Sequence, residues 1–479
     1  MLRTRAAQVS LWEAVLPAEV LRLPDELARV DTLLDDPVFF APFVPLFDPR
    51  VGRPSTPMET YLRMMFVKFR YRLGYESLCR EVSDSITWRR FCRIPLDGKV
   101  PHPTTLMKLT TRCGTAAVDG CNEALLAKAA EAKLLRTSRL RADTTVVPAN
   151  VAYPTDSGLL AKAVRRIAVT GRRVQAAGGA TRTRLRDRSR SAGKRAHGIA
   201  AKLRLRGAVG RDEAQHTVQR ITGELAGLAE RAAADAQRLL TNARRALRRA
   251  QLNSEQLSAA GGRDPAAGRR RGRLRRAVND LTDLLDATLQ IAVQTRQRVA
   301  GIIPDGATRR VSLHEPDARP ITKGRLGKPV EFGYKAQVVD NTDGVVLDHS
   351  VDQGNPADAP QLAPAVERVV ARTGRVPRTV TADRGYGETR VEDQLHRLGV
   401  RTVVIPRKGT PGKARQATER RPAFRKTVKW RTGSEGRISS LKRGYGWDRT
   451  RLDGTEGARI WTGQAVFAHN LVKIATLIG

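Results

Sequence analysis

Residues 154–331 contain no Phe, Trp or Tyr, and this limits the kind of core that the segment can build. Within it, residues 156–300 hold 32 Lys and Arg against 12 Asp and Glu. Breaks at Gly178 and around Pro265 separate segments whose apolar side chains recur at coiled-coil spacing. The spaced apolar positions are Ile221, Leu225, Leu228, Ala232, Leu274, Val278, Leu281, Leu285 and Ala292. We therefore expect paired long helices that form a basic helical insertion at 156–325 within another domain.

Positive charge dominates the whole chain, whose formal net charge is +38. Such a chain attracts polyanions because neutralised phosphates release counterions, and nucleic acid is the leading candidate. The alternative for the insertion is a solvated helix surface whose arginines reflect a GC-rich genome and not contact with DNA. A run of about 18 apolar residues, as a membrane helix needs, does not occur, and no signal-peptide core is found. We expect a cytoplasmic protein with no membrane partner.

The segment before the insertion divides into a helical part and a strand. Residues 1–133 read as mostly helical, with an amphipathic helix from Thr56 to Leu73 that has Thr56 as its N-cap and a second helix from Tyr75 to Val82. The basic side chains on these short helices suggest a helix-turn-helix reader of DNA. The alternative is a packing domain with a solvated basic face. Residues 134–155 then bring the β-branched run LRADTTVV, which predicts a strand carrying Asp143.

The segment after the insertion, 326–479, resumes with strand patterns. Two strands flank a hairpin turn at 341–344, a helix fits 360–372, and the run RTVTAD predicts a buried strand ending at Asp383. A helix, another strand at 400–406 and a helix carrying Glu435 follow. This order predicts an α/β fold with a central mixed sheet of the ribonuclease-H-like kind, built from 134–155 and 326–479, with Asp143, Asp383 and Glu435 close together.

Carboxylates in such an arrangement suit hard cations. Oxygen ligands favour Mg²⁺ or Mn²⁺, and two ions about 3.5–4 Å apart activate an attacking oxygen while stabilising a leaving one. Taken singly, each carboxylate is better explained by a turn, a cap or a surface ion pair. Arg431, Glu435 and Lys442 are spaced to lie on one helical stripe. Arg384 follows Asp383 and is a candidate phosphate ligand.

The residues around the carboxylates resemble the DDE transposases of bacterial insertion sequences. The likeness rests on ADTTVVPANVAYPTDSGLL, on TADRGYG, on Arg-x3-Glu-x6-Lys, and on VGRPSTPMETYLRMMFVKFRYRLGYESLCREV, which is similar to an N-terminal domain common in such transposases. It extends over nearly the whole chain. The branch that it indicates has the motif Tyr-x2-Arg-x3-Glu-x6-Lys, and Val428 stands here at the Tyr position.

The resemblance implies a DNA transposase that cleaves the ends of an insertion sequence and joins the freed 3′-hydroxyl to target DNA. It implies that Asp143, Asp383 and Glu435 are catalytic and hold two Mg²⁺ ions, for which Mn²⁺ substitutes. The expected partners are double-stranded DNA, as terminal inverted repeats and target, and a second copy of the chain in the synaptic complex, which places the protein at the nucleoid. Arg431, Lys442, Arg384 and Arg437 are the expected DNA-binding residues.

Two aromatic residues and two rival functions remain open at this level. Tyr386 and Trp430 are candidates for stacking on a flipped base, although core packing is the favoured explanation for either. A simple metal-dependent nuclease of the same fold would cut DNA without joining ends. A non-catalytic DNA-binding or architectural protein would use the basic insertion alone, with structural carboxylates.

Overall fold

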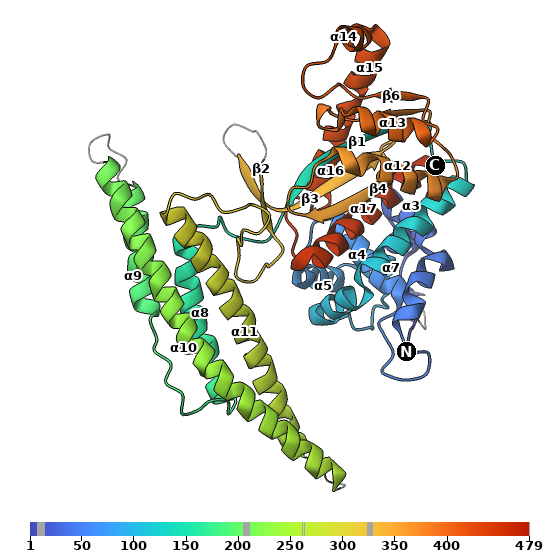
Figure 1. Cartoon of the computed structure of the whole chain (residues 1–479). Helices are drawn as coiled ribbons and strands as arrows, with labels where there is room; N and C mark the ends of the chain where they lie inside the picture. The colour runs from blue at the N-terminus through green and yellow to red at the C-terminus, as the bar shows by residue number, and fades with distance from the viewer. Residues whose placement is uncertain (7–14, 205–210, 261, 263, 323–328, 479) are drawn as a thin grey trace. The chain divides into compact units, whose positions relative to one another are not determined.

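The computed structural model describes residues 1–6, 15–204, 211–260, 262, 264–322 and 329–478 (Figure 1). The chain forms two compact units: Met1–Asn150 with Ile321–Gly479, here called the sheet unit, and Val151–Pro320, here called the helical unit. The expected end of the insertion at residue 325 lies outside the described residues. No helix among the described residues is long and apolar enough to cross a membrane.

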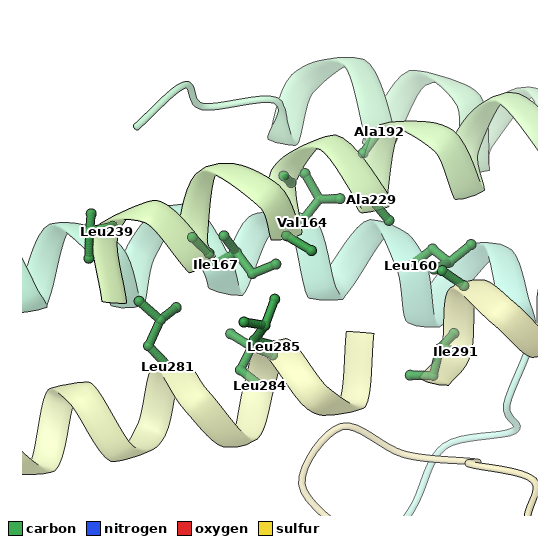
Figure 2. Packing of buried hydrophobic residues seen from close by; sticks show 14 of the residues in the cluster. Leu160, Val164, Ile167, Ala192, Ala229, Leu239, Leu281, Leu284, Leu285 and Ile291 are labelled. Atoms are coloured by element: carbon green, nitrogen blue, oxygen red, sulfur yellow. The ribbon is translucent and has the colours of Figure 1, made fainter. Parts of the chain in front are cut away.

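In its described residues, the helical unit is built on four helices that share one aliphatic core (Figure 2). Leu160, Val164 and Ile167 on the first helix meet Leu239 on the third and Leu281 on the fourth within this core. Alanines at the intervening positions let the long helices approach closely. Regularly spaced aliphatic side chains therefore fill this core without aromatic residues. The helices are α8 Asp156–Ala176, α9 Ser189–Arg204, α10 Arg211–Ala259 and α11 Pro265–Val299.

The sheet unit begins with helices. They are α2 Ala18–Leu21, α3 Asp25–Leu34, the 3₁₀ helix η1 Pro37–Leu46, α4 Met58–Arg70, α5 Tyr75–Asp84, α6 Ile86–Phe91 and α7 Pro103–Glu131. Helix α4 starts at Met58 after Pro57, without a side-chain cap, so the expected N-cap at Thr56 is wrong. Met58 to Phe69 are all buried, Arg63 and Lys68 included. Helix α4 therefore lacks the exposed basic face that a DNA-reading or solvated helix would present.

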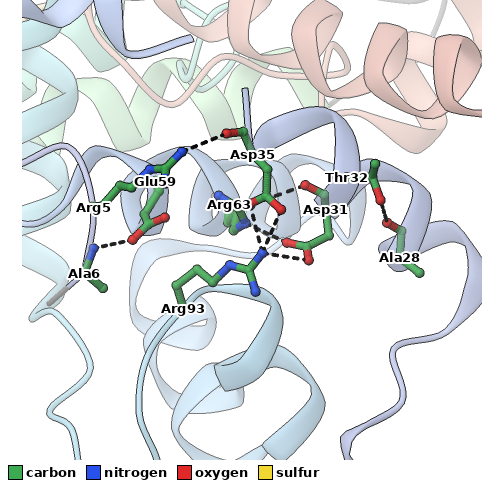
Figure 3. A network of polar contacts seen from close by, with 9 residues as sticks. All are labelled: Arg5, Ala6, Ala28, Asp31, Thr32, Asp35, Glu59, Arg63 and Arg93. Atoms are coloured by element: carbon green, nitrogen blue, oxygen red, sulfur yellow. Dashed lines mark hydrogen bonds and ion pairs between the residues drawn. The ribbon is translucent and has the colours of Figure 1, made fainter. Parts of the chain in front are cut away.

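Buried charge on α4 is neutralised at its first turns by a polar network (Figure 3). Arg63 Nε lies 2.9 Å from Asp31 Oδ1, and its Nη2 lies 2.6 Å from Asp35 Oδ1. Arg93, which follows α6, contacts the same two carboxylates. Because a buried cation is costly unless paired, this network fixes α3, α4 and the end of α6 against one another.

In the described residues, six strands form one mixed sheet in the order β2-β3-β1-β5-β6, with β4 paired to β3. Strand β1 runs antiparallel to β3 and parallel to β5. The strands are β1 Arg139–Pro148, β2 Arg319–Thr322, β3 Val330–Asp340, β4 Val346–Gln353, β5 Thr379–Thr381 and β6 Thr402–Val404. This mixed sheet with β1 at its centre agrees with the expected α/β, ribonuclease-H-like class.

Helices in the second half of the chain complete the sheet unit. They are α12 Ala359–Thr373, η2 Arg384–Tyr386, α13 Thr389–Arg397, α14 Lys413–Arg420, α15 Pro422–Arg431, α16 Gly433–Gly444 and α17 Gly454–Ile478. Helix α16 packs on β1 and β3, while α17 packs on β4 and also on α3, α4 and α7. Gln464 Nε2 of α17, for example, donates to Tyr61 Oη of α4 at 3.1 Å. The N-terminal helices and the sheet therefore make one compact unit and not two.

Candidate active site

The parallel pairing of β1 with β5 brings two carboxylates to one edge of the sheet. Arg141 of β1 pairs with Thr381 of β5, and each strand has its aspartate two residues further along the chain. Asp143 on β1 is therefore level with Asp383, which follows β5 and caps η2 by accepting from the Gly385 N–H at 2.8 Å. Because the two carboxylates are close, the negative charge of Asp383 raises the pKa of Asp143.

Asp143 is a buried carboxylate with a shifted pKa. Burial and the charges of Asp383 and Glu435 raise this pKa, Arg431 and the Thr144 N–H oppose the rise, and the net result is a pKa of about 6. The Thr144 N–H lies 2.8 Å from Asp143 Oδ1. A buried carboxylate with two like charges nearby favours any bound cation that removes the repulsion.

Glu435 lies in the first turn of α16, where the N-terminal helix dipole stabilises its charge. Its side chain is 68% exposed, in contrast to that of Asp143. Arg431 connects the two: its Nη1 lies 3.2 Å from Asp143 Oδ2, and its Nη2 lies 3.6 Å from Glu435 Oε1. The arginine of the expected Arg-x3-Glu stripe thus faces the first carboxylate as well as the third.

A buried ion pair fixes the helix that carries Glu435. Arg141 donates to both carboxylate oxygens of Asp340 at 2.9 and 2.7 Å, and its Nη1 donates to the Trp430 carbonyl at 3.1 Å. Gly433 allows this approach, because a Cβ there would lie 2.0 Å from Arg141 Nη1. Sequence reasoning missed Arg141 and Asp340. The sequence did contain a signal for this pair, because Arg141 and Asp340 are charged residues within two apolar strand patterns.

Arg437 belongs to this internal network. Its Nε lies 3.4 Å from Asp340 Oδ2, and its Nη1 lies 3.3 Å from His469 Nε2. Burial and the charge of Arg437 lower the pKa of His469 to about 3, which keeps the ring neutral. The expectation that Arg437 binds DNA is not supported, because its guanidinium points inward and holds α16 in place.

Gly385, Tyr386 and Gly387 shape the loop after Asp383. A Cβ on Gly387 would lie 1.9 Å from the Pro406 carbonyl oxygen, so only glycine fits there. Tyr386 is fully buried, and its hydroxyl accepts from Gln337 Nε2 at 3.1 Å. Its ring therefore has no free face for a flipped base, and the core-packing alternative describes it.

The remaining candidates lie nearer the surface. Arg384 is exposed, but its Nε donates to the Arg407 carbonyl at 2.9 Å and its Nη2 donates to the Gly409 carbonyl. Trp430 is half-buried, with the guanidinium carbons of Arg139 and Arg141 4.4 and 4.8 Å from its ring centroid. These arginines compete with a nucleobase for the indole. Lys442, in the last turn of α16, is half-buried.

The donors present fit a hard divalent cation only in part. Asp143 and Asp383 supply carboxylate oxygens at neighbouring positions, as Mg²⁺ prefers. Among the described residues, however, no three His, Cys, Asp or Glu side chains lie close enough to form a metal site. The guanidinium of Arg431 is the cation that bridges Asp143 to Glu435.

Two protein families match the chain. Residues 18–112 match the Transposase domain (DUF772), and residues 300–471 match the Transposase DDE domain. The second match includes Asp383 and Glu435, whereas Asp143 lies before it. No curated protein and no solved structure matches the chain.

The fold and the matches define a class: transposases whose DDE domain has the ribonuclease-H-like fold. The chain belongs to the DDE transposases of insertion sequences, with the N-terminal transposase domain that accompanies the DDE domain. DNA is accordingly its partner.

Proposed function

We propose that this transposase cleaves the ends of its insertion sequence and joins the freed 3′-hydroxyls to target DNA. Asp143, Asp383 and Glu435 are the proposed catalytic residues. The observation that carries the assignment is the geometry around Asp143. The β1–β5 pairing sets it level with Asp383, and Arg431 contacts both Asp143 and Glu435, in a chain whose DDE-domain match includes Asp383 and Glu435. Arg431-x3-Glu435-x6-Lys442 supports our assignment of the chain to the branch with the Tyr-x2-Arg-x3-Glu-x6-Lys motif, although Val428 stands at the Tyr position.

The proposed reaction hydrolyses one phosphodiester and then, in the joining step, exchanges a second one for a new phosphodiester. Water attacks the phosphodiester at the element end, and the 3′ oxygen leaves and takes up a proton. The resulting 3′-hydroxyl attacks a target phosphodiester and loses its proton, and the 3′ oxygen of the target leaves. No external energy source is needed, because a phosphodiester is both consumed and formed.

Two Mg²⁺ ions, or Mn²⁺ in their place, bound by the three carboxylates would activate the attacking oxygen and stabilise the leaving one. The protein's own part is to hold these side chains. The β1–β5 pairing aligns Asp143 with Asp383, while Arg141, Asp340 and Arg437 fix α16 on the sheet.

DNA contacts follow from the charges around the carboxylates. Arg431 and Lys442 lie on α16 or just before it, and we assign them to phosphates near the cut, with Arg384 beyond the second carboxylate. The partners are the terminal inverted repeats and the target, held by two copies of the chain in the cytoplasm at the nucleoid.

The test is strand cleavage and joining of an end-containing duplex in Mg²⁺. Asp143→Asn, Asp383→Asn and Glu435→Gln should each lower the rate at least about 10³-fold, or about 4 kcal/mol of transition-state stabilisation. Asp393→Asn, which changes an exposed carboxylate on α13, is the matched control and should leave the rate unchanged.

The two rival functions give different results. Cleavage without a joined product would indicate a simple nuclease of the same fold. Cleavage that persists unchanged in folded Asp143→Asn protein would contradict the catalytic assignment, and DNA binding with no cleavage by the wild-type protein would indicate an architectural role.

A further inference from the structure

Helix α4 buries two cations, and they differ in one respect. Arg63 is 0% exposed and has carboxylate partners in Asp31 and Asp35 (Figure 3). Lys68, a turn and a half further along, is 2% exposed. Within the described part of the chain, no oxygen accepts a hydrogen bond from Lys68 Nζ and no carboxylate forms an ion pair with it. A buried cation without a counter-ion is costly and calls for an explanation.

Aromatic rings surround the ammonium group of Lys68. Its Nζ lies 4.0 Å from the ring centroid of Trp461, 4.3 Å from that of Phe69 and 4.8 Å from that of Tyr75. Such contacts offset part of the desolvation cost. Burial, together with the charge of Arg451, lowers the pKa of Lys68 to about 7. The rings hold the amine in place, but they do not neutralise its charge.

Lys68 borders a cavity of about 40 Å³, here called the Lys68 pocket. Since one water needs roughly 10–15 Å³, the pocket has room for about three waters or one small oxyanion. The charged and titratable residues that line or face it are Lys68 and Arg72 at the end of α4, Tyr75 on α5, Tyr445 after α16, and Asp448, Arg449 and Arg451 before α17. Among the described residues that line the pocket, Lys68 and three arginines thus face one carboxylate, that of Asp448.

The cations of the pocket are not equivalent. Arg72 has the left-handed φ of 58°, and its guanidinium lies 2.6 Å from Asp448 Oδ2 and donates to the Arg443 carbonyl at 3.2 Å. Arg72 therefore uses the pocket's one carboxylate. Arg449 and Arg451 are exposed and form no hydrogen bond or ion pair with any described residue. Among the residues that the structure describes, Lys68, Arg449 and Arg451 are therefore left without a counter-ion.

We propose that the Lys68 pocket binds one phosphate group, supplied by the backbone of the transposon-end DNA. The source of the phosphate rests on the proposed function, whereas the anion site stands on the pocket itself. Helix α16 connects the pocket to the candidate active site, because Glu435 is in its first turn and Tyr445 caps its last. At 1.5 Å per residue, the helix separates Glu435 from Gly444 by about 13 Å. A phosphate in the pocket would therefore lie a few nucleotides from the cut.

Sulfate is the probe for the pocket, because its charge does not change between pH 6 and 8.5. The measurement is sulfate affinity from thermal shift, at constant ionic strength in chloride. Sulfate favours the protonated amine, so its affinity should fall up to tenfold for each pH unit above the pKa of Lys68. Lys68→Met, which keeps the side-chain volume inside the aromatic rings, should abolish this pH dependence. Lys108→Met, at an exposed position on α7, is the control and should retain it.

A duplex with the transposon end identifies the source of the phosphate. Lys68→Met should lower the slope of log K against log salt by about 0.9, as expected for one lost phosphate contact. Lys108→Met should leave that slope unchanged. Strand cleavage by the Asp143→Asn, Asp383→Asn and Glu435→Gln proteins is measured separately, so failure of the anion site is distinguished from failure of the catalytic assignment. If Lys68→Met does not fold, the exposed Arg451→Gln tests the same pocket.

Two outcomes would overturn the proposal. Sulfate affinity that is the same in Lys68→Met and wild type, or that does not vary with pH, would show that the pocket is not an anion site. Sulfate and inorganic phosphate binding at Lys68 with an unchanged DNA slope would show that the pocket takes a free oxyanion, and the assignment to DNA would be wrong.

Discussion

The helical unit and the sheet unit solve the problem of a core in different ways. The core of the helical unit is made of Leu, Ile, Val and Ala, without one aromatic side chain. The sheet unit buries large aromatic residues, among them Phe66, Tyr386 and Trp447, and it also buries the Arg141–Asp340 ion pair. A repeated apolar period is enough to align long helices, whereas the position of a catalytic helix depends on specific polar contacts.

Removing one partner of the buried pair should have the largest effect on stability. Asp340→Ala leaves Arg141 buried without its carboxylate and also removes a partner of Arg437. We expect a loss of about 3–5 kcal/mol in the free energy of unfolding, measured in denaturant. Replacing both partners, as Arg141→Met with Asp340→Leu, should recover part of the loss. A loss below about 1 kcal/mol for Asp340→Ala would show that the pair does not fix α16.

A cavity in the aliphatic core should act on the helical unit alone. Leu281→Ala removes a fully buried side chain of α11 and should cost about 3 kcal/mol. All five tryptophans lie outside residues 151–320, so their fluorescence follows the sheet unit, while circular dichroism follows the helices of both units. The fluorescence transition should stay in place, and only the part of the dichroism transition that it does not account for should move.

Leu289, on the same helix but 42% exposed, provides the control. Leu289→Ala should change either transition by less than about 0.5 kcal/mol. A fluorescence transition that shifts together with the dichroism would show that the two units unfold as one.

The pH dependence of stability should separate the units further, because Asp143 belongs to the sheet unit. Its folded pKa of about 6 is above its ordinary value of 3.8, so the protonated form favours folding. That contribution is present below pH 3.8, decreases as the pH rises to 6, and is absent above it. Relative to wild type, Asp143→Asn should gain about 3 kcal/mol in the free energy of unfolding across this window, since each pKa unit is worth about 1.4 kcal/mol.

Magnesium should reverse this pH dependence of stability if Asp143 binds the ion. A bound cation requires the ionised carboxylate, so Mg²⁺ should raise the melting temperature of the wild type above pH 6, and chelation should remove the effect. The same titration on Asp143→Asn should show little Mg²⁺ stabilisation. Equal stabilisation of both proteins would locate the ion elsewhere.

The smallest expected effect concerns the basic surface of the helical unit. Lys162, Arg165 and Arg166 on α8 line a groove of about 430 Å³, closed on its other side by residues 311–314. They form no ion pair with any residue that the structure describes. Changing all three to Gln should lower the salt slope of DNA binding by about 0.9 for each lost phosphate contact.

The matched control loses the same charge from another helix. Arg245, Arg248 and Arg249 are exposed on α10, and changing all three to Gln should have a smaller effect than the α8 variant. Equal slopes for both variants would favour a solvated basic surface without a specific groove.

Much of the fold can be predicted from local sequence patterns. The rest depends on contacts between residues that are far apart in the sequence. The runs around Asp143 and Asp383 predict their strands because β-branched residues and turn signals are local. The pattern of α4 predicts that its basic side chains are exposed, but Arg63 and Lys68 are buried. Their environment is made by α3 and α17, which no spacing within α4 reveals.

The candidate site divides along the same line. Motif spacing selected Arg431 and Glu435, and the structure places them together. The inward direction of Arg437 depends on Asp340, and the burial of Tyr386 depends on Gln337. Both partners are on β3, about 50 to 100 positions away in the sequence. Chemistry-bearing residues could be recognised from sequence, but their supporting partners could not.

The antiparallel neighbours β1 and β3 give the helical unit a particular place in the chain. Pro148 pairs with Gly333, and the Ala149 N–H donates to the Phe332 carbonyl at 3.0 Å, so the unit is the connection of a hairpin. Closing a flexible connection of roughly 180 residues costs about 2 kcal/mol more than closing one of about 20. A compact helical unit leaves only short flexible segments on either side of it, so much of that cost is removed once the unit is folded. The pairing of the strand that carries Asp143 therefore depends on the stability of a unit that contributes none of the three carboxylates.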